Sequence, residues 1–335
     1  MCQNGLQNGE KAMAFAKDKL APNAMGGTEL MKHALASRMP EGLLDNFQIF
    51  ISRVHEELNP DKVKIYWHQD LPWDPAAVHL KETWQQFDHF VFNSNWQMDM
   101  FNKYLGIPYS RSSVLENAIE PIEYKSKPSR QDGIVRIIYH TTPHRGLELI
   151  VPVFEKLCEK HDNIQLDVYS SFKIYGWGER DAQYEALFER CKNHPKINYH
   201  GSVPNTEIRA ALQDADIFAY PSIWIESSCI SLIEAMSAGV ICVHPNYGAL
   251  YDTSGALTRM YGWQEDVNEH ADYHLAVLDE TIEDVKACRH IEEANYVKSY
   301  ADLRFNWKRR AYQWQALLEK LKTEKPASKF ITLKS

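Results

Sequence analysis

The sequence predicts an α/β protein built from two doubly wound domains with a cleft between them. Three observations lead to this prediction: short apolar segments alternate with helix-like segments, the alternation restarts after one break, and 335 residues suffice for two cores. Continuous apolar strands that alternate with helices are typical of a parallel sheet covered on both faces. Open sheets of this kind bind ligands beyond the carboxyl ends of their strands.

The first half of the chain contains four strand-like segments: FQIFI at 47–51, VKIYW at 63–67, HFVF at 89–92 and SSVLE at 112–116. Helical spacing of apolar residues predicts two helices between them, TELMKHALASRM at 28–39 and SNWQMDMFNKYL at 94–105. The charged segment 118–133, with two prolines and a glycine, interrupts the pattern, so we predict a linker there.

After this linker the alternation restarts, with strands predicted at 134–139, 164–170, 196–201, 216–222 and 240–245. The helices predicted between them cover 147–160, 181–193, 205–215 and 231–238. We therefore expect an N-terminal domain over 1–120, a second domain over 121–300, and a C-terminal helical segment, 301–335, that packs back on the N-terminal domain. The aromatic and basic stretch 301–322 is interpreted as one helix, whose aromatic side either packs on the protein or contacts anionic lipid.

The composition, 44% hydrophobic and 24% charged, is that of a globular protein. A formal net charge of -8 argues against a broad nucleic-acid-binding surface. The six cysteines are scattered without a C-x-x-C pair, which indicates reduced thiols. The first residues have no signal-peptide pattern and no apolar run has the length of a membrane span, so we expect a cytoplasmic protein.

The segment ESSCISLIEAMSAG, residues 226–239, places two glutamates eight residues apart around the start of a predicted helix. Pro221 favours departure from the preceding strand, so Glu226 is expected in a loop at the ligand-binding edge. Ser227 or Ser228 can cap the helix that follows. The unpaired N–H groups of a helix start suit phosphate, and a carboxylate accepts paired sugar hydroxyls. The segment therefore fits a nucleoside diphosphate sugar.

Residues 221–239, PSIWIESSCISLIEAMSAG, resemble the E-x7-E region of the retaining glycosyltransferases of family 4. Other segments resemble family motifs in the same order: MGGTELM (25–31), IYWHQDLP (65–72), FNSNWQMDMF (92–101), LENAIEP (115–121), TTPHRGLELI (141–150) and YGALYDT (247–253). The resemblance implies the GT-B fold, in which two Rossmann-like, doubly wound parallel-sheet domains face each other across a cleft.

The resemblance also implies roles for individual residues. Three of them would act at the reacting centre: Glu226 at the donor sugar, His68 at the reacting sugar from the N-terminal domain, and Arg145 at the phosphates. Glu234 would accept the ribose hydroxyls. The other donor-binding positions lie in loops, at the helix start and in a glycine turn: Gly26, Gly27, Ser228, Cys229, Ile230, Thr141, Thr142 and Gly176.

The chain departs from the family pattern at His140, where many members carry a second basic residue five positions before the one matched by Arg145. Histidine is usually neutral at pH 7, so phosphate binding would shift in part to hydroxyl and backbone groups. The acidic triplet 214–216, DAD, resembles a metal-binding D-x-D motif, but it closes a predicted helix and opens a strand, so we interpret it as a surface turn. The family requires no metal, and we expect no cofactor.

The leading hypothesis is a retaining, metal-independent glycosyltransferase that uses a UDP, GDP or ADP sugar. Its acceptor would be a glycan, a lipid-linked molecule or a small molecule, and it would bind no nucleic acid. Peripheral membrane contact through the stretch 301–322 remains open. Two other hypotheses also remain open: a sugar-nucleotide epimerase or phosphorylase of the same fold, and a non-catalytic protein that binds sugar nucleotides or glycans.

Overall fold

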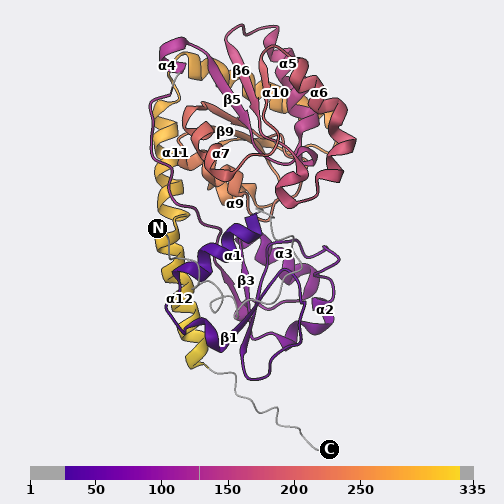
Figure 1. The fold of residues 1–335 in the computed structure, drawn as a ribbon, viewed down its shortest axis with the longest axis vertical. Helices are drawn as coiled ribbons and strands as arrows, with labels where there is room; N and C mark the ends of the chain where they lie inside the picture. Colours follow the sequence, from indigo (N-terminus) through magenta and orange to yellow (C-terminus); the bar gives the residue numbers. More distant parts are fainter. Residues whose placement is uncertain (1–26, 128, 325–335) are drawn as a thin grey trace, which may run out of the picture. The chain divides into compact units, whose positions relative to one another are not determined.

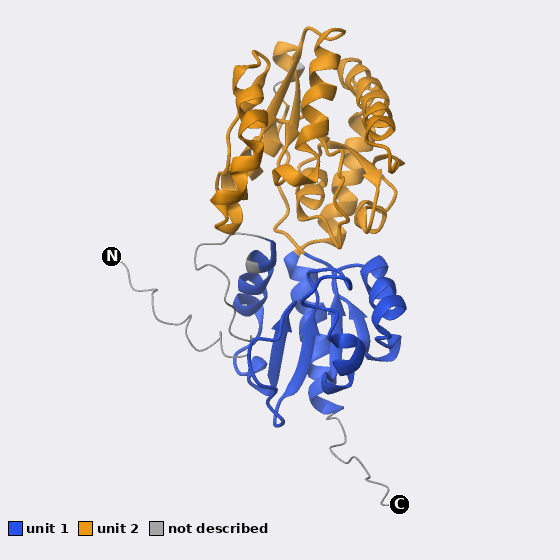
Figure 2. Ribbon diagram, turned by 90° about the vertical axis from the view of Figure 1, so that its right-hand side faces the viewer, with its two compact units in different colours: residues 1–20, 27–117, 307–335 blue, residues 21–26, 118–306 orange. Residues whose placement is uncertain are grey.

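The computed structural model describes residues 27–127 and 129–324. Within this part, the chain forms two compact units (Figure 2): unit 1 holds residues 27–117 and those from 307 onward, and unit 2 holds residues 118–306. The chain passes from unit 1 to unit 2 after Asn117, three residues before the predicted boundary at 120, and it returns to unit 1 at Trp307. Each unit contains one parallel sheet.

The sheet of unit 1 has four parallel strands in the order β1-β2-β3-β4. The strands are β1 (Phe47–Ile51), β2 (Val63–Trp67), β3 (His89–Phe92) and β4 (Ser112–Val114). The helices of this unit are α1 (Gly27–Arg38), α2 (Leu80–Thr83), α3 (Asn95–Leu105) and α12 (Trp307–Thr323), with short 3-10 turns at Leu44–Asn46, Trp84–Gln86 and Tyr109–Arg111. The strand predicted at 112–116 is two residues shorter, and the other three have the predicted bounds.

Neighbouring residues of β2 point to opposite faces of this sheet, as the pleat requires. Tyr66 joins an apolar cluster with Leu80 of α2 and Phe101 of α3. Trp67 instead meets Trp314 of α12 edge to face, with ring centroids 4.9 Å apart. Helices α1 and α12 therefore cover one face and α2 and α3 the other, as Figure 1 shows.

The single helix predicted over 301–322 is wrong, because the structure has two helices there, α11 (Ile291–Arg304) and α12. The break lies at Phe305 and Asn306, where the chain returns from unit 2 to unit 1. The aromatic side of α12 is buried in unit 1, where Trp314 is fully enclosed and the buried Arg310 forms an ion pair with Glu116 at 3.0 Å. None of the helices in the described ranges is long and apolar enough to cross a membrane.

The sheet of unit 2 has six parallel strands in the order β10-β9-β8-β5-β6-β7. They are β5 (Val135–Tyr139), β6 (Ile164–Val168), β7 (Ile197–Tyr199), β8 (Ile217–Ala219), β9 (Ile241–Asn246) and β10 (Arg259–Gly262). Renumbered within the unit, this order is 3-2-1-4-5-6, that of the doubly wound nucleotide-binding fold. The chain winds in one direction from β5 and in the other from β8, so the switch point lies between these two strands.

The α-helices of unit 2 are α4 (Ser129–Asp132), α5 (Leu147–Cys158), α6 (Glu185–Asn193), α7 (Asn205–Asp214), α8 (Ile230–Ser237), α9 (Leu250–Ser254), α10 (Val267–Lys286) and α11. Short 3-10 turns occupy Pro143–Arg145, Phe172–Tyr175 and Gly178–Tyr184. Helix α5 packs against α10, and α8 packs against α11. Right-handed crossovers that leave the switch point in opposite directions place α5 and α8 on opposite faces of the sheet.

A buried histidine lies between α10 and the end of the sheet in unit 2. His274 is fully buried, and within the described ranges neither of its ring nitrogens has a hydrogen-bond partner. Burial, with smaller contributions from the nearby His270 and His244, lowers the pKa of His274 to about 3. The ring is therefore neutral in the folded protein and becomes protonated below about pH 6.5 in the unfolded chain.

His274→Phe should make the protein less sensitive to acid. Because the pKa of His274 is lower in the folded protein than in the unfolded chain, acid favours the unfolded chain, which binds the proton more readily. The stability contribution of the neutral His274 ring is therefore complete above pH 6.5 and is lost as the pH falls towards 3. Between pH 7 and pH 4 the wild-type protein should lose about 3 kcal/mol more unfolding free energy than the variant. Urea unfolding at both pH values measures this difference, and an equal loss in the two proteins would contradict it.

Candidate functional site

The switch point between β5 and β8 brings two loops of unit 2 together. Ile137 and Ile138 of β5 pair directly with β8, so the segments after the two strands leave the same edge of the sheet side by side. The segment after β5 carries Thr142 and Arg145, and the segment after β8 carries Tyr220 and Glu226. In open α/β sheets this crevice is the usual ligand-binding position.

Arg145 and Glu226 form an ion pair across these two loops. The Oε1 atom of Glu226 accepts hydrogen bonds from both Arg145 and Tyr220. Glu226 is buried, with 5% of its surface exposed. Burial is the largest single influence and would lower the pKa of Arg145, but the charge and hydrogen bond of Glu226, with Tyr220 and Tyr175, together outweigh it and raise that pKa. The guanidinium is also held within its own loop, since its Nε donates to Thr142 Oγ1 at 3.2 Å. The site therefore holds a fixed cation and a fixed carboxylate in contact.

Two glycines allow the loops to approach so closely. Gly146 has φ of 128°, and a Cβ at this position would lie 2.3 Å from the carbonyl oxygen of Pro221. Gly248, with φ of 61°, would place a Cβ 2.5 Å from the carbonyl oxygen of Glu226. That same oxygen accepts a hydrogen bond from the amide of Ala249 at 2.7 Å. The backbone of Glu226 is thus fixed by contacts that only glycine permits.

The second glutamate of the motif, Glu234, lies in the second turn of α8 and is 5% exposed. Asn205 Nδ2 lies 3.1 Å from both of its carboxylate oxygens, and Arg209 Nη1 lies 3.2 Å from Oε1. Burial raises the pKa of Glu234, and these two partners oppose that rise. A carboxylate has about four lone-pair positions, of which these contacts use three.

The start of α8 differs from the prediction in one respect. Its N-cap residue is the buried Cys229, whose side chain makes no capping hydrogen bond, so the expected serine cap is wrong. The first helix-internal hydrogen bond is donated by Ile233, so the amides of Ile230 and its neighbours have no helical partner. Ser231 Oγ donates to the carbonyl oxygen of His140 at 3.3 Å, which ties this helix start to the end of β5.

Two histidines beside the site are neutral at physiological pH. Burial lowers the pKa of His140 to about 3. Burial, followed by the charges of Arg145 and Arg180, lowers the pKa of His144 to about 4. His144 also stacks on Phe172, with ring centroids 5.1 Å apart. Neither ring adds positive charge, so Arg145 is the cation that the structure places next to Glu226.

The remaining predicted positions are distributed over both units. Thr141 and Thr142 are buried directly after β5, and Gly176 ends a 3-10 turn after β6 with φ of 75°. Ser228 and Ile230 flank the N-cap of α8 and are partly exposed. Gly27 begins α1 in unit 1, and Gly26 lies outside the described residues.

His68 directly follows β2 in unit 1, at the strand end where it was predicted. It is 1% exposed and stacks on Phe92, with ring centroids 4.9 Å apart and planes 6° from parallel. Burial, with a smaller contribution from His79, lowers its pKa well below 6.5. Its Nε2 is buried and has no hydrogen-bond partner within the described ranges. A neutral, enclosed ring cannot act as a charged group in this conformation.

Sequence analysis missed the partners of the two glutamates, namely Tyr220, Asn205 and Arg209. Asn205 and Arg209 belong to α7, on the same helix face one turn apart, and that spacing was the available signal. Among the residues that the structure describes, no group of three or more His, Cys, Asp or Glu side chains is arranged to hold a metal ion.

Comparison with known families identifies the chain. The family model described as "Glycosyl transferases group 1" matches residues 120–298, which is more than half of the sequence. The chain belongs to the glycosyl transferases of group 1. The matched range contains the Arg145–Glu226 pair and Glu234 together with its partners.

This glycosyltransferase is similar to subunits of phosphatidylinositol N-acetylglucosaminyltransferases. A phosphatidylinositol N-acetylglucosaminyltransferase subunit from Arabidopsis thaliana is 24% identical over 184 residues, 53% of this chain and 40% of the relative. The phosphatidylinositol N-acetylglucosaminyltransferase GPI3 subunit of Saccharomyces cerevisiae is 23% identical over 166 residues, 47% of this chain and 35% of the relative. The matched region is thus less than half the length of either relative.

Solved structures share the fold of this glycosyltransferase. A sucrose-phosphate synthase from Thermosynechococcus elongatus aligns with a TM-score of 0.64 at 14% identity, over 83% of this chain and 74% of the other. Anabaena HepE, in complex with UDP-glucose, aligns with a TM-score of 0.58 at 14% identity, over 88% and 82% of the two chains. With a parallel sheet in each unit, these likenesses confirm the predicted GT-B fold.

Proposed function

We propose that this glycosyltransferase moves a sugar from a nucleoside diphosphate sugar to an acceptor hydroxyl, with retention of configuration and without a metal ion. The observation that carries the proposal is the contact between Arg145 and Glu226 at the switch point of unit 2. A cation and a carboxylate in contact match the two ends of such a donor, its phosphates and its sugar hydroxyls. The start of α8 lies at the same edge of the sheet, next to the end of β5, because Ser231 of α8 contacts the carbonyl oxygen of His140.

Each group has a distinct task in the proposed reaction. Arg145 and the amides at the start of α8, which have no helix-internal partner, stabilise the negative charge that develops on the leaving diphosphate. This stabilisation by fixed protein charges is the reason for proposing a reaction without a metal. Glu226 accepts hydrogen bonds from the transferred sugar, and Glu234 accepts those of the ribose.

Retention follows if the acceptor attacks from the face that the diphosphate leaves. The bond from the anomeric carbon to the diphosphate oxygen breaks, and the bond to the acceptor oxygen forms on the same face. The leaving phosphate oxygen takes the acceptor proton, so no further protein base is needed. We propose a UDP sugar as donor, since HepE was solved with UDP-glucose, and a lipid-linked acceptor, since the two relatives described above are subunits of phosphatidylinositol N-acetylglucosaminyltransferases.

A thermal-shift panel tests the donor. UDP, GDP, ADP, CDP and their common sugars are added with and without EDTA. A nucleotide at about 100 times its dissociation constant should add roughly 2.7 kcal/mol to the free energy of unfolding. We expect stabilisation by UDP and UDP sugars that EDTA does not change. Stabilisation that EDTA removes would contradict metal independence, and no shift with any compound would contradict the donor site.

Turnover distinguishes transfer from the two other hypotheses. A transferase should release free nucleoside diphosphate only after an acceptor is added. An epimerase would interconvert the sugar nucleotide without an acceptor, a phosphorylase would require inorganic phosphate, and a binding protein would show no turnover with any acceptor. Mass spectrometry of the nucleotide pool with and without a lipid-linked acceptor separates these outcomes.

A further inference from the structure

One face of α7 contacts both the buried carboxylate and the segment that leads into unit 2. Asn205, Arg209 and Gln213 follow one another at four-residue spacing, so their side chains lie along one side of the helix. Asn205 Nδ2 contacts the carboxylate of Glu234, at 3.1 Å from each oxygen. Gln213 contacts the segment, where its Nε2 donates to the carbonyl oxygen of Glu123 at 3.0 Å. The first turn of this helix face therefore contacts Glu234, and its last turn contacts the segment that leads into unit 2.

Arg209 contacts both targets. Its Nη1 donates to Glu234 Oε1 at 3.2 Å. Its Nη2 donates to the carbonyl oxygens of Glu120 and Pro121, at 2.7 and 3.3 Å. The planar guanidinium has five N–H donors in a fixed fork, so it can hold a carboxylate on one edge and main-chain oxygens on another. A lysine ammonium does not have this geometry.

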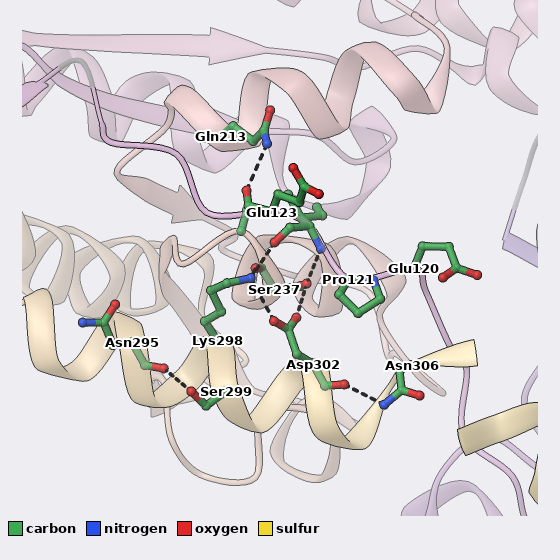
Figure 3. Close-up of polar contacts among 12 residues, drawn as sticks. Glu120, Pro121, Glu123, Gln213, Ser237, Asn295, Lys298, Ser299, Asp302 and Asn306 are labelled. Carbon is green, nitrogen blue, oxygen red and sulfur yellow. Dashed lines mark hydrogen bonds and ion pairs between the residues drawn. The ribbon is translucent and has the colours of Figure 1, made fainter. Parts of the chain in front are cut away.

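The segment that Arg209 holds is the connecting segment, residues 118–127, which follows the passage from unit 1. Figure 3 shows further contacts that hold the middle of this segment, residues 120–123, within unit 2. The amide of Ile122 donates to Ser237 Oγ at 2.9 Å, and its carbonyl oxygen accepts from Lys298 Nζ. Lys298 also donates to the carbonyl oxygen of Ser237 at 2.6 Å and to Asp302 at 2.8 Å.

Ser237 is the last residue of α8, the helix that carries Glu234. The connecting segment is therefore attached to α8 at its end, through Ser237, and at its middle, through Arg209 and Glu234. The attachment at Ser237 is independent of any ligand in the proposed donor site. The attachment at Arg209 shares its carboxylate with that site.

We propose that Arg209 is a positioning residue for nucleotide binding: it keeps Glu234 ionised and aligned, and it couples that carboxylate to the connecting segment. This inference rests on the proposed function, in which Glu234 accepts the ribose hydroxyls. Arg209 is the cation in contact with this buried carboxylate, and a buried charge that loses its partner is strongly disfavoured. The two ribose hydroxyls would compete for Glu234 with Asn205, whose side-chain amino group contacts both carboxylate oxygens. The charged contact between Arg209 and Glu234 would remain.

Nucleotide affinity measured by calorimetry at several pH values tests the positioning role. The probe is the nucleoside diphosphate that the thermal-shift panel selects. Arg209→Met should weaken binding about tenfold or more, with a much smaller effect on kcat than on KM. Its affinity should also rise from pH 6 to pH 8, because without the cation Glu234 is protonated at a higher pH. Arg209→Lys, which keeps the charge, should recover most of the affinity at pH 8 and flatten the profile.

Gln213→Ala is the matched control, because it removes a contact with the connecting segment and leaves Glu234 untouched. Its nucleotide affinity and pH profile should equal those of the wild-type protein. Equal affinity and equal pH profiles of Arg209→Met and Gln213→Ala would overturn the inference while the proposed function stands. No nucleotide binding by the wild-type protein would overturn the proposed function itself.

Hydrogen exchange tests the coupling to the connecting segment. In the wild-type protein, the nucleoside diphosphate should slow amide exchange in residues 119–124, because it immobilises Glu234 and with it Arg209. Gln213→Ala should exchange faster without ligand and still show this slowing. Arg209→Met should lose the slowing at saturating nucleotide. Slowing of the same size in Arg209→Met would overturn the coupling.

Discussion

Glu226→Gln should lower turnover by about 100-fold or more, with a much smaller effect on nucleotide affinity. Glutamine keeps an oxygen that can accept from both Tyr220 and Arg145, so the two loops should remain together. The variant lacks the negative charge that would hold the sugar hydroxyls and oppose the positive charge at the anomeric carbon in the transition state. Interactions that strengthen in the transition state change kcat, and steady-state kinetics with the selected donor measures it.

Glu234→Gln is the matched control for this prediction, since it removes the second carboxylate of the same motif. It should raise the donor KM and the dissociation constant of the nucleoside diphosphate, and it should change kcat less than Glu226→Gln does. Equal and negligible effects of the two substitutions would contradict the assigned roles of both glutamates. Larger loss of kcat in Glu234→Gln than in Glu226→Gln would reverse those roles.

The stability of the same variants reports on the ion pair. Removing one partner leaves the other charge poorly compensated, so Glu226→Gln should reduce the free energy of unfolding by about 2 kcal/mol. Arg145→Gln should have a similar effect. The double variant should lose less than the sum of the two, because contacting charges have coupling energies of about 0.5–3 kcal/mol. Additive losses would contradict a direct contact.

The sheets were predictable because their strands have strong local signals. The segments 47–51, 63–67 and 89–92 are apolar except for one residue each, and a strand of a parallel sheet that is covered on both faces needs mostly apolar residues. Strand β10, RMYG, has no apolar run and lies at the edge of the sheet, so its residues provide no comparable signal. The 3-10 turn at 178–184 was predicted in part as helix, because its apolar spacing continues into α6.

The candidate residues could be predicted, but their contacts could not. Glu226 and Arg145 were identified separately from their motifs, and 81 positions separate them in the chain. Their contact depends on β5 lying beside β8, and strand alternation alone does not specify strand order. The partners of Glu234 come from α7, whose sequence NTEIRAALQD is that of an ordinary amphipathic helix. The four-residue spacing of Asn205 and Arg209 places them on one helix face, but it does not identify Glu234 as their target.

Gly146→Ala should be the most damaging single methyl addition near the site. At φ of 128° an L-residue is strained by about 1–3 kcal/mol, and the new Cβ would lie 2.3 Å from the Pro221 carbonyl oxygen. One of the two loops must move, and Arg145 and Glu226 would then separate. We expect a loss of more than about 3 kcal/mol in unfolding free energy and a fall in kcat comparable to that of Glu226→Gln. Urea unfolding and steady-state kinetics measure the two effects.

Gly133→Ala separates the clash from the backbone strain. Gly133 also has a positive φ, 72°, and belongs to unit 2, but a Cβ there would meet no atom within 4 Å. Its alanine variant should lose only about 1 kcal/mol of unfolding free energy and keep full turnover. If Gly146→Ala had effects as small as those of Gly133→Ala, the two loops could move apart without separating Arg145 from Glu226. The close contact between Gly146 and Pro221 would then not be required for the ion pair. A large loss confined to Gly146→Ala would mean that the ion pair depends on a contact between main chains, which no substitution at either charged residue can reveal.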